Sequence, residues 1–330
     1  MTEPIERVEY EAQRLFAEHP SRLAHPNKRA VFEIACPPGC VHSGRIVYSR
    51  WPGAGLPPEV DPEAALGILE VRPGVYDYEP VADLPGAAEW YVNFADPELF
   101  FGYGGGLFAQ DELQCAEHPV LGALREALLA EGRAARTAEG GRPTPVLVAG
   151  AERRCVIATD SDAARGRPAG LYGTQFASAS ADAVRSATTR IDPPTASNII
   201  AIAAPAYGAG RYQSETIRKV LETACTGFRA AVAESASLAG EAPVVVHTGF
   251  WGCGAFGGNR VLMTMLQLLA AEAAGVDRLV FHTVRADGRA PVEEAQLRIR
   301  DALGHSPLGI EEAVERIAAL GLEWGTSNGT

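Results

Sequence analysis

Two adjacent carboxylates are the first residues of the chain that could do chemistry. Gln110, Asp111 and Glu112 stand at the start of a short helical pattern. Cleavage of a glycosidic bond passes through an oxocarbenium-like state, so the site needs an acid for the leaving oxygen and a base for the incoming water. One carboxyl group can serve as both in turn. Acidic residues at a helix start also have a purely structural explanation, because they complement the helix dipole. On the three residues alone, the structural explanation is favoured.

A glycine-rich segment is the second candidate. HTGFWGCGAFGGN, residues 247–259, lies between a β-branched run and a long helical pattern, which predicts a strand-to-helix turn. Glycine permits positive φ and lets a ligand approach the main chain, while the free N–H groups at a helix start attract anions. The segment is therefore a candidate phosphate-binding loop, although such a turn is more often only a tight connection.

Four blocks of the chain resemble, in the same order, motifs of the poly(ADP-ribose) glycohydrolase (PARG) family, the large macrodomain hydrolases. WGCGAFGG, residues 251–258, resembles the loop that wraps the diphosphate of ADP-ribose, and residues 217–228 resemble the helix before it. VNFAD, residues 92–96, and AQDELQCAEHPVL, residues 109–121, resemble the ribose-binding strand end and the catalytic QEE segment. The resemblance implies a macrodomain-like three-layer α/β/α fold with a mixed sheet.

The resemblance also implies roles for individual residues. Glu112 takes the position of the acid/base, Asp111 that of the carboxylate holding the ribose, and Gln110 that of a supporting amide. The other implied substrate-binding residues come from the strand end, a tyrosine near the adenosine and the glycine-rich loop: Asn93, Asp96, Tyr172, Gly249, Phe250, Trp251, Gly252, Cys253, Gly254, Ala255 and Phe256.

The activity that follows from the resemblance is that of a divergent ADP-ribosyl glycohydrolase. Its substrate would be an ADP-ribosyl or related NAD-derived compound, cleaved at the anomeric carbon. Two alternatives stay open. One is a macrodomain that binds ADP-ribose without cleaving it, and the other is a biosynthetic enzyme acting on an NAD-derived nucleotide.

The chain departs from the family pattern around the ribose and the base. Asn93 and Asp96 exchange the amide and carboxylate of the family's VDFAN, and Phe250 replaces a polar amide. A gapless alignment places residues 100–102, Phe-Phe-Gly, where the family has three glycines, and Thr283 where it has an aromatic that stacks on adenine. We therefore expect the diphosphate end of the site to be retained and the sugar and base ends to be changed.

Alternating strand and helix patterns must position these residues. Residues 110–118 are expected to form a short helix that Pro119 ends or kinks, and Ser214 is expected to cap the helix over residues 214–228. Residues 165–180 are expected to form a loop or lid. Strands are predicted at residues 88–95, 145–150, 154–160, 198–205, 244–249 and 278–284. This βαβα order predicts a mixed or parallel sheet with its ligand at the carboxyl ends of strands.

Composition limits the domain organisation and the partners. The chain of 330 residues, 47% hydrophobic, can form one large domain with accessory parts. We expect an N-terminal accessory region over 1–88, with irregular Pro-rich chain packed on the core, a macrodomain core over 89–305, and a C-terminal helix and tail over 306–330. The net charge of −12 argues against general nucleic acid binding. No apolar signal core and no apolar run of about 18 residues occur, which indicates a cytoplasmic protein without membrane contact.

The cysteines indicate neither a disulfide framework nor a catalytic thiol. Six cysteines are spread unevenly over the chain, which suits a reducing compartment. Cys36, Cys40 and His42, in CPPGCVH, have the residue types of a zinc half-site, but the intervening Pro-Pro-Gly also predicts a simple turn, which we favour. Cys253 is expected to pack under the glycine-rich loop. We therefore expect no metal and no cofactor.

Overall fold

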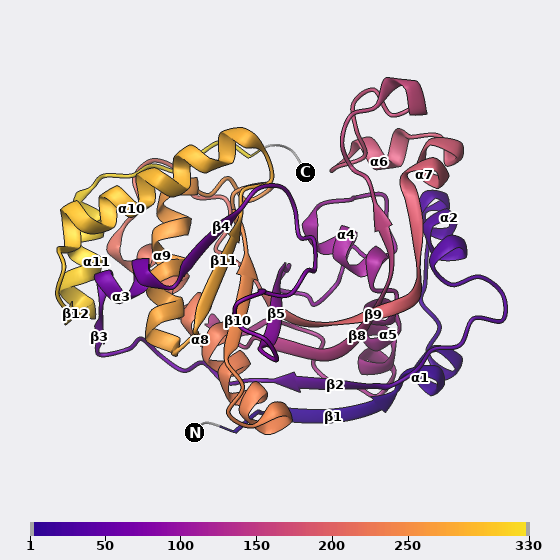
Figure 1. Cartoon of the computed structure of the whole chain (residues 1–330), viewed down its shortest axis with the longest axis horizontal. Coiled ribbons are helices and arrows are strands. Elements are labelled where there is room, and N and C mark those ends of the chain that lie inside the picture. The colour runs from indigo at the N-terminus through magenta and orange to yellow at the C-terminus, as the bar shows by residue number, and fades with distance from the viewer. Residues whose placement is uncertain (1–2, 328–330) are drawn as a thin grey trace.

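The computed structural model describes residues 3–327. An eight-stranded sheet in the order β1-β2-β8-β9-β5-β10-β11-β4 runs through its centre (Figure 1). Neighbours from β9 to β4 are parallel, and neighbours from β1 to β9 are antiparallel, so the predicted mixed sheet is confirmed. The strands are β1 (Glu6–Glu11), β2 (Arg45–Arg50), β4 (Leu69–Arg72), β5 (Ala88–Phe94), β8 (Val146–Ile157), β9 (Thr188–Ile202), β10 (Val244–Thr248) and β11 (Arg278–His282).

Helices cover both faces of this sheet, which confirms the three-layer arrangement (Figure 1). Because side chains alternate along a strand, Ile200 and Ile202 of β9 pack into the core under one layer, whereas Ile199 and Ala201 pack under the other. The first layer contains α3 (Pro62–Gly67), α8 (Ser214–Ala239), α9 (Arg260–Ala274), α10 (Arg289–Leu303) and α11 (Ile310–Ala319). The second contains α1 (Ala12–Glu18), α2 (Pro26–Ala35), α4 (Gln110–Glu117), α5 (Val120–Ala130), α6 (Gln175–Ser178) and α7 (Ala181–Ala187).

The first 88 residues are more regular than their Pro-rich stretches predict. β1 and β2 form one edge of the central sheet, and β4 forms the other. Tyr48 of β2 is fully buried in the same hydrophobic cluster as Tyr91 of β5, so this region shares the core instead of lying on it. The expectation of irregular chain was therefore wrong for these three strands. The boundary at residue 88 stays a prediction.

Two strands predicted around residue 150 are one long strand, β8. The register with β9 shifts between Val148 and Ala151, and Gly150 adopts a φ of +80° at that point. A Cβ on Gly150 would stand 2.5 Å from the carbonyl oxygen of Arg45 in the neighbouring chain segment. The glycine therefore marks a bulge inside a continuous strand, where the sequence pattern suggested a strand end.

Smaller elements complete the described chain. They are the two-stranded pairs β3 (Glu59–Val60) with β12 (Leu308–Gly309) and β6 (Ala138–Glu139) with β7 (Arg142–Pro143), and the 3₁₀ turns η1 (Ala163–Arg165) and η2 (Ala286–Gly288). The predicted loop over 165–180 is thus partly helical, since it contains α6. Between residues 3 and 327, no helix combines the length and the apolar composition needed to cross a bilayer.

Candidate active site

The side chain of Gln110 connects the start of α4 to the end of β5 through two hydrogen bonds. Its Oε1 accepts a hydrogen bond from the amide of Phe94 at 2.7 Å, and its Nε2 donates to the carbonyl of Val92 at 3.1 Å. α4 then ends before Pro119, which precedes α5, as the sequence predicts. The side chain of Gln110 therefore fixes the two following carboxylates relative to the sheet.

Glu112 is held between the first turn of α4 and a glycine. Its Oε2 accepts a hydrogen bond from the amide of Ala109 at 2.9 Å, an arrangement that satisfies one of the free N–H groups of the helix start. Its Oε1 faces Gly102, where a Cβ atom would stand only 2.2 Å away. Glu112 is buried, so its position is determined by these two contacts.

Asp111 is buried beside Glu112 and contacts Asn93. Asn93 donates from Nδ2 to Asp111 Oδ1 at 3.0 Å, and the Cys115 thiol lies 3.6 Å from the same oxygen. Burial, followed by the negative charge of Glu112, raises the pKa of Asp111 to about 7. Within residues 3–327 the Oδ1 atom of Asn93 is buried and has no hydrogen-bond partner. A buried acceptor of this kind is costly unless a ligand or water satisfies it.

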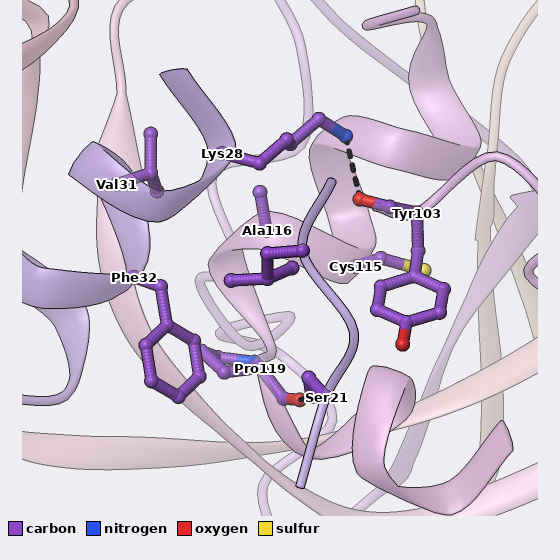
Figure 2. Close-up of a pocket in the computed structure, with 9 residues that line it drawn as sticks. Ser21, Lys28, Val31, Phe32, Tyr103, Cys115, Ala116 and Pro119 are labelled. Carbon is purple, nitrogen blue, oxygen red and sulfur yellow. Dashed lines mark hydrogen bonds between the residues drawn. The ribbon is translucent and has the colours of Figure 1, made fainter. Parts of the chain in front are cut away.

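Lys28 is a site residue that the sequence did not reveal. It lies on α2, is 2% exposed, and donates from Nζ to the carbonyl of Tyr103 at 2.9 Å, as Figure 2 shows. Burial lowers the pKa of Lys28 to about 8, against the opposing effect of Glu112, Cys115 and Asp111. A buried lysine is rare unless it is paired, so this cation offsets part of the charge of the acidic pair. Nothing in the local sequence distinguishes it from a surface lysine.

A small cavity beside Lys28 is lined by residues of α2 and α4 together with neighbouring segments, and Figure 2 draws these residues. It has a volume of about 20 Å³ and is lined by Ser21, Lys28, Tyr103 and Cys115, among others. That volume is enough for about one water molecule. The cavity is too small for a nucleotide.

The glycine-rich loop joins β10 to α9 and folds back on itself. Gly258 donates to the carbonyl of Gly252 at 2.8 Å, and Gly252 has a φ of +74°. Asn259 caps α9 by accepting a hydrogen bond from the amide of Leu262 at 3.1 Å. Across the described residues 3–327, the half-exposed residues 254–256 donate no backbone hydrogen bond to the protein. These amides, in the loop that precedes α9, therefore stay available to an anion.

The aromatic side chains at the start of this loop pack into the core. Trp251 is buried and donates from Nε1 to the carbonyl of Ile202 at 3.0 Å. Phe250 packs edge-on against Phe281, with 5.1 Å between ring centroids. Cys253 is half-buried, and burial raises the pKa of its thiol far above the ordinary value, as expected for a packing residue. These side chains anchor the loop, whereas residues 254–256 remain half-exposed.

Two other predicted residues lie at the margins of the site. Asp96 is exposed, and its Oδ1 accepts a hydrogen bond from the amide of Glu98 at 2.9 Å, which places it in the turn after β5. Tyr172 is 39% exposed, and burial together with the charge of Glu112 raises the pKa of its phenol to about 12. Tyr172 therefore lies near the acidic pair, whereas Asp96 serves the turn.

The C-terminal tail lies against the glycine-rich loop, a contact that the sequence did not predict. Asn259 donates from Nδ2 to the carbonyl of Glu323 at 2.8 Å, and Trp324 stacks on Tyr212 at 4.3 Å between ring centroids. A Cβ on Gly257 would stand 3.2 Å from the carbonyl oxygen of Gly325. The tail therefore forms one edge of the candidate phosphate-binding loop.

Replacing Asp111 by Asn is expected to stabilise the protein increasingly as the pH rises. The pKa of Asp111 is raised in the folded chain, so its stabilising contribution is complete only below the unfolded pKa of about 3.9 and is lost as the pH rises through about 7. Thermal unfolding between about pH 5 and pH 8 should therefore show a Tm difference that grows with pH. Asp96→Asn, which removes an exposed carboxylate, is the control. A Tm difference that does not change with pH would contradict the burial of the Asp111 carboxyl group.

Together these features define a macrodomain-like α/β protein, with a glycine-rich loop and a buried acidic pair at the ends of adjacent parallel strands. Residues 169–290 match the model of a family described as poly (ADP-ribose) glycohydrolase (PARG), macro domain fold. The predicted PARG-like macrodomain is thus confirmed over this segment, which contains Tyr172 and the glycine-rich loop. Residues 93–112, with the acidic pair, lie outside the matched segment.

Two solved structures are among those that match this chain. PARG from Thermomonospora curvata bound to the inhibitor ADP-HPD is 16% identical, with 87% of this chain and 98% of that chain covered and a TM-score of 0.43. PARG from Deinococcus radiodurans in complex with ADP-ribose is 13% identical, with 90% of this chain and 95% of that chain covered and a TM-score of 0.41.

Proposed function

We propose that this protein is a divergent ADP-ribosyl glycohydrolase, which hydrolyses a bond at the anomeric carbon of an ADP-ribosyl or related NAD-derived substrate. The observation that carries the proposal is the pairing of two adjacent parallel strands. β5 leads to Asn93 and, through Gln110, to the acidic pair, while β10 leads directly to the glycine-rich loop. Carboxyl ends of neighbouring parallel strands form one edge of a sheet, where α/β proteins bind their ligands.

For each part of an ADP-ribosyl substrate, the protein offers a group that can bind it. The free amides of residues 254–256, in the loop before α9, suit the diphosphate. The ribose hydroxyls can donate to the unpartnered Oδ1 of Asn93 and to Asp111. The half-exposed ring of Tyr172 offers a stacking face beside the same helix. The substrate is therefore recognised at its phosphates by main chain and at its ribose by side chains.

Glu112 is the proposed acid/base. In its protonated form it gives its proton to the leaving oxygen as the bond to the anomeric carbon breaks. The resulting carboxylate then takes a proton from the water that adds to that carbon, which restores the acid and leaves a free ribose hydroxyl. Asp111 holds the ribose, and the buried cation of Lys28 limits the cost of gathering negative charge at this place.

Calorimetry with ADP-ribose and with ADP, followed by incubation with substrates, tests the proposal. We expect ADP-ribose to bind more tightly than ADP, because only ADP-ribose presents the second ribose to Asn93 and Asp111. Chromatography should then detect ADP-ribose released from poly- or mono-ADP-ribosylated protein. Absence of ADP-ribose binding would overturn the proposal. Binding without release from either substrate would favour a macrodomain that binds ADP-ribose without cleaving it.

A further inference from the structure

Cys36, Cys40 and His42 come together in the connection between α2 and β2. Cys36 directly follows α2, and the turn after it, in which Cys40 donates to the carbonyl of Pro37 at 3.0 Å, brings the second thiol back toward the first. One ligand atom from each of the three residues lies within 4.8 Å of the other two. The turn that the sequence predicts therefore exists, and it also assembles three zinc-ligand side chains.

The spacing of these atoms agrees with tetrahedral zinc. Cys40 Sγ and His42 Nε2 are 3.6 Å apart. Zn–S bonds of about 2.3 Å and Zn–N bonds of about 2.0–2.1 Å at a tetrahedral angle place sulfur and nitrogen about 3.6 Å from each other. Binding of one metal ion by Cys40 and His42 therefore requires no change in the distance between these two atoms.

Within residues 3–327, His42 Nδ1 is buried and has no hydrogen-bond partner, and Glu152 of β8 is the carboxylate near it. Its Oε2 lies 3.6 Å from His42 Nδ1, the ring nitrogen on the side away from Cys40. Glu152 is itself held, because its Oε1 accepts hydrogen bonds from the amide and hydroxyl of Ser43 at 3.0 and 2.8 Å. Phe16 stacks on the imidazole at 3.6 Å between ring centroids, which fixes the ring plane. A carboxylate behind the second nitrogen orients the histidine toward a metal.

The charges around the cluster also balance with a divalent cation. Two thiolates and the Glu152 carboxylate carry three negative charges. Zn²⁺ supplies two positive charges, and the buried guanidinium of Arg154, which donates to Glu152 at 2.9 Å, supplies the third. Without a metal, neutral thiols would leave the ligand cluster with no role beyond packing.

We propose that Cys36, Cys40 and His42 bind one Zn²⁺, with water as the fourth ligand and Glu152 orienting His42. The site holds the carboxyl end of α2 close to β8, while Lys28 in the first turn of the same helix donates to the carbonyl of Tyr103. Zinc would therefore stabilise the helix that carries Lys28. The proposal does not depend on the glycohydrolase activity.

Metal analysis of the full chain tests this site. Protein produced in zinc-containing medium without a histidine tag should contain about one Zn²⁺ per chain, and removal of the metal by a chelator should lower Tm. The double variant C36S/C40S should lose the metal, whereas Cys225→Ala, which changes a buried cysteine of α8, should retain it. Folded wild-type protein without zinc, or with a Cys36–Cys40 disulfide detected by mass spectrometry, would overturn the proposal.

Cobalt substitution keeps the test valid if the cysteine variants do not fold. Addition of Co²⁺ to the metal-free wild-type protein should give the intense visible bands of a tetrahedral site and a thiolate-to-cobalt charge-transfer band. Glu152→Gln, which preserves shape but removes the charge behind His42, should weaken zinc binding about 10- to 100-fold. Octahedral cobalt spectra without charge transfer would show that the thiolates are not ligands and would overturn the proposal.

Discussion

Replacing Glu112 by Gln is expected to lower kcat for the release of ADP-ribose by about 10²- to 10⁴-fold, the range that proton transfer by one positioned group contributes. The amide oxygen of Gln can still accept the hydrogen bond from Ala109 that now binds Oε2 at 2.9 Å. The side chain therefore keeps its place, but it can no longer exchange a proton with the leaving oxygen or with water. Affinity for ADP-ribose should change little.

Single-turnover kinetics at saturating substrate measure this effect, and calorimetry with ADP-ribose separates it from binding. Glu98→Gln is the matched control, because Glu98 stands in the same β5–α4 connection but is exposed. Normal turnover by Glu112→Gln would remove Glu112 as the acid/base. If the variant does not fold, or if it loses affinity for ADP-ribose while kcat stays normal, Glu112 has instead the structural role of an acidic residue at a helix start.

The parts of the site that the sequence predicted depend on local patterns. The short helix before Pro119, the strand VVVHT and the helix after Asn259 each leave a signal within a few residues. The prediction that Ser214 caps α8 was wrong, because Ser214 is the first residue of the helix and the N-cap position is Gln213, which makes no side-chain capping hydrogen bond. Because β5 and β10 both carry motifs at their ends, the sequence also predicted that these motifs share one edge of the sheet. The pairing of β10 with β5 bears out that expectation.

The parts that the sequence missed depend on contacts between distant segments. Lys28 is more than 80 positions from the acidic pair and becomes a site residue only because β1 and β2 carry α2 onto the same face of the sheet. Likewise, the tail residue Gly325 meets Gly257 across the fold. Periodicity and capping patterns contain no information about such distances.

Two residues close to Gly102, Gly104 and Phe100, have different structural roles. Gly104 accepts hydrogen bonds from the amides of Ala24 and His25, each at 3.0 Å, and a Cβ there would stand 2.2 Å from the carbonyl oxygen of Arg22. This glycine therefore serves the packing of the N-terminal segment. Phe100, aligned with a family glycine, is buried and keeps a φ of +53°. Phe100 therefore adopts the left-handed backbone conformation that favours glycine.

Replacing Gly102 by Ala is expected to reduce turnover by about 10²-fold, the loss that a displacement of about 1 Å in a reacting group can cause. The added Cβ would stand 2.2 Å from Glu112 Oε1 and 3.1 Å from its carboxyl carbon, so either the loop or the carboxylate must move. Since Glu112 is also bound to Ala109, a moved carboxylate loses its alignment with the substrate. Binding of the diphosphate, which uses residues 254–256, should be affected much less.

Gly105→Ala in the same loop is the matched control for this variant. A Cβ on Gly105 meets only the carbonyl oxygen of Gly102, at an ordinary 3.5 Å, and neither glycine has a positive φ. Both substitutions therefore reduce the freedom of the unfolded chain similarly, and only Gly102→Ala presses on Glu112. Parallel measurements of kcat, ADP-ribose affinity and Tm should separate the two variants by kcat. Equal kcat values would mean that the contact between Gly102 and Glu112 does not position the proton donor.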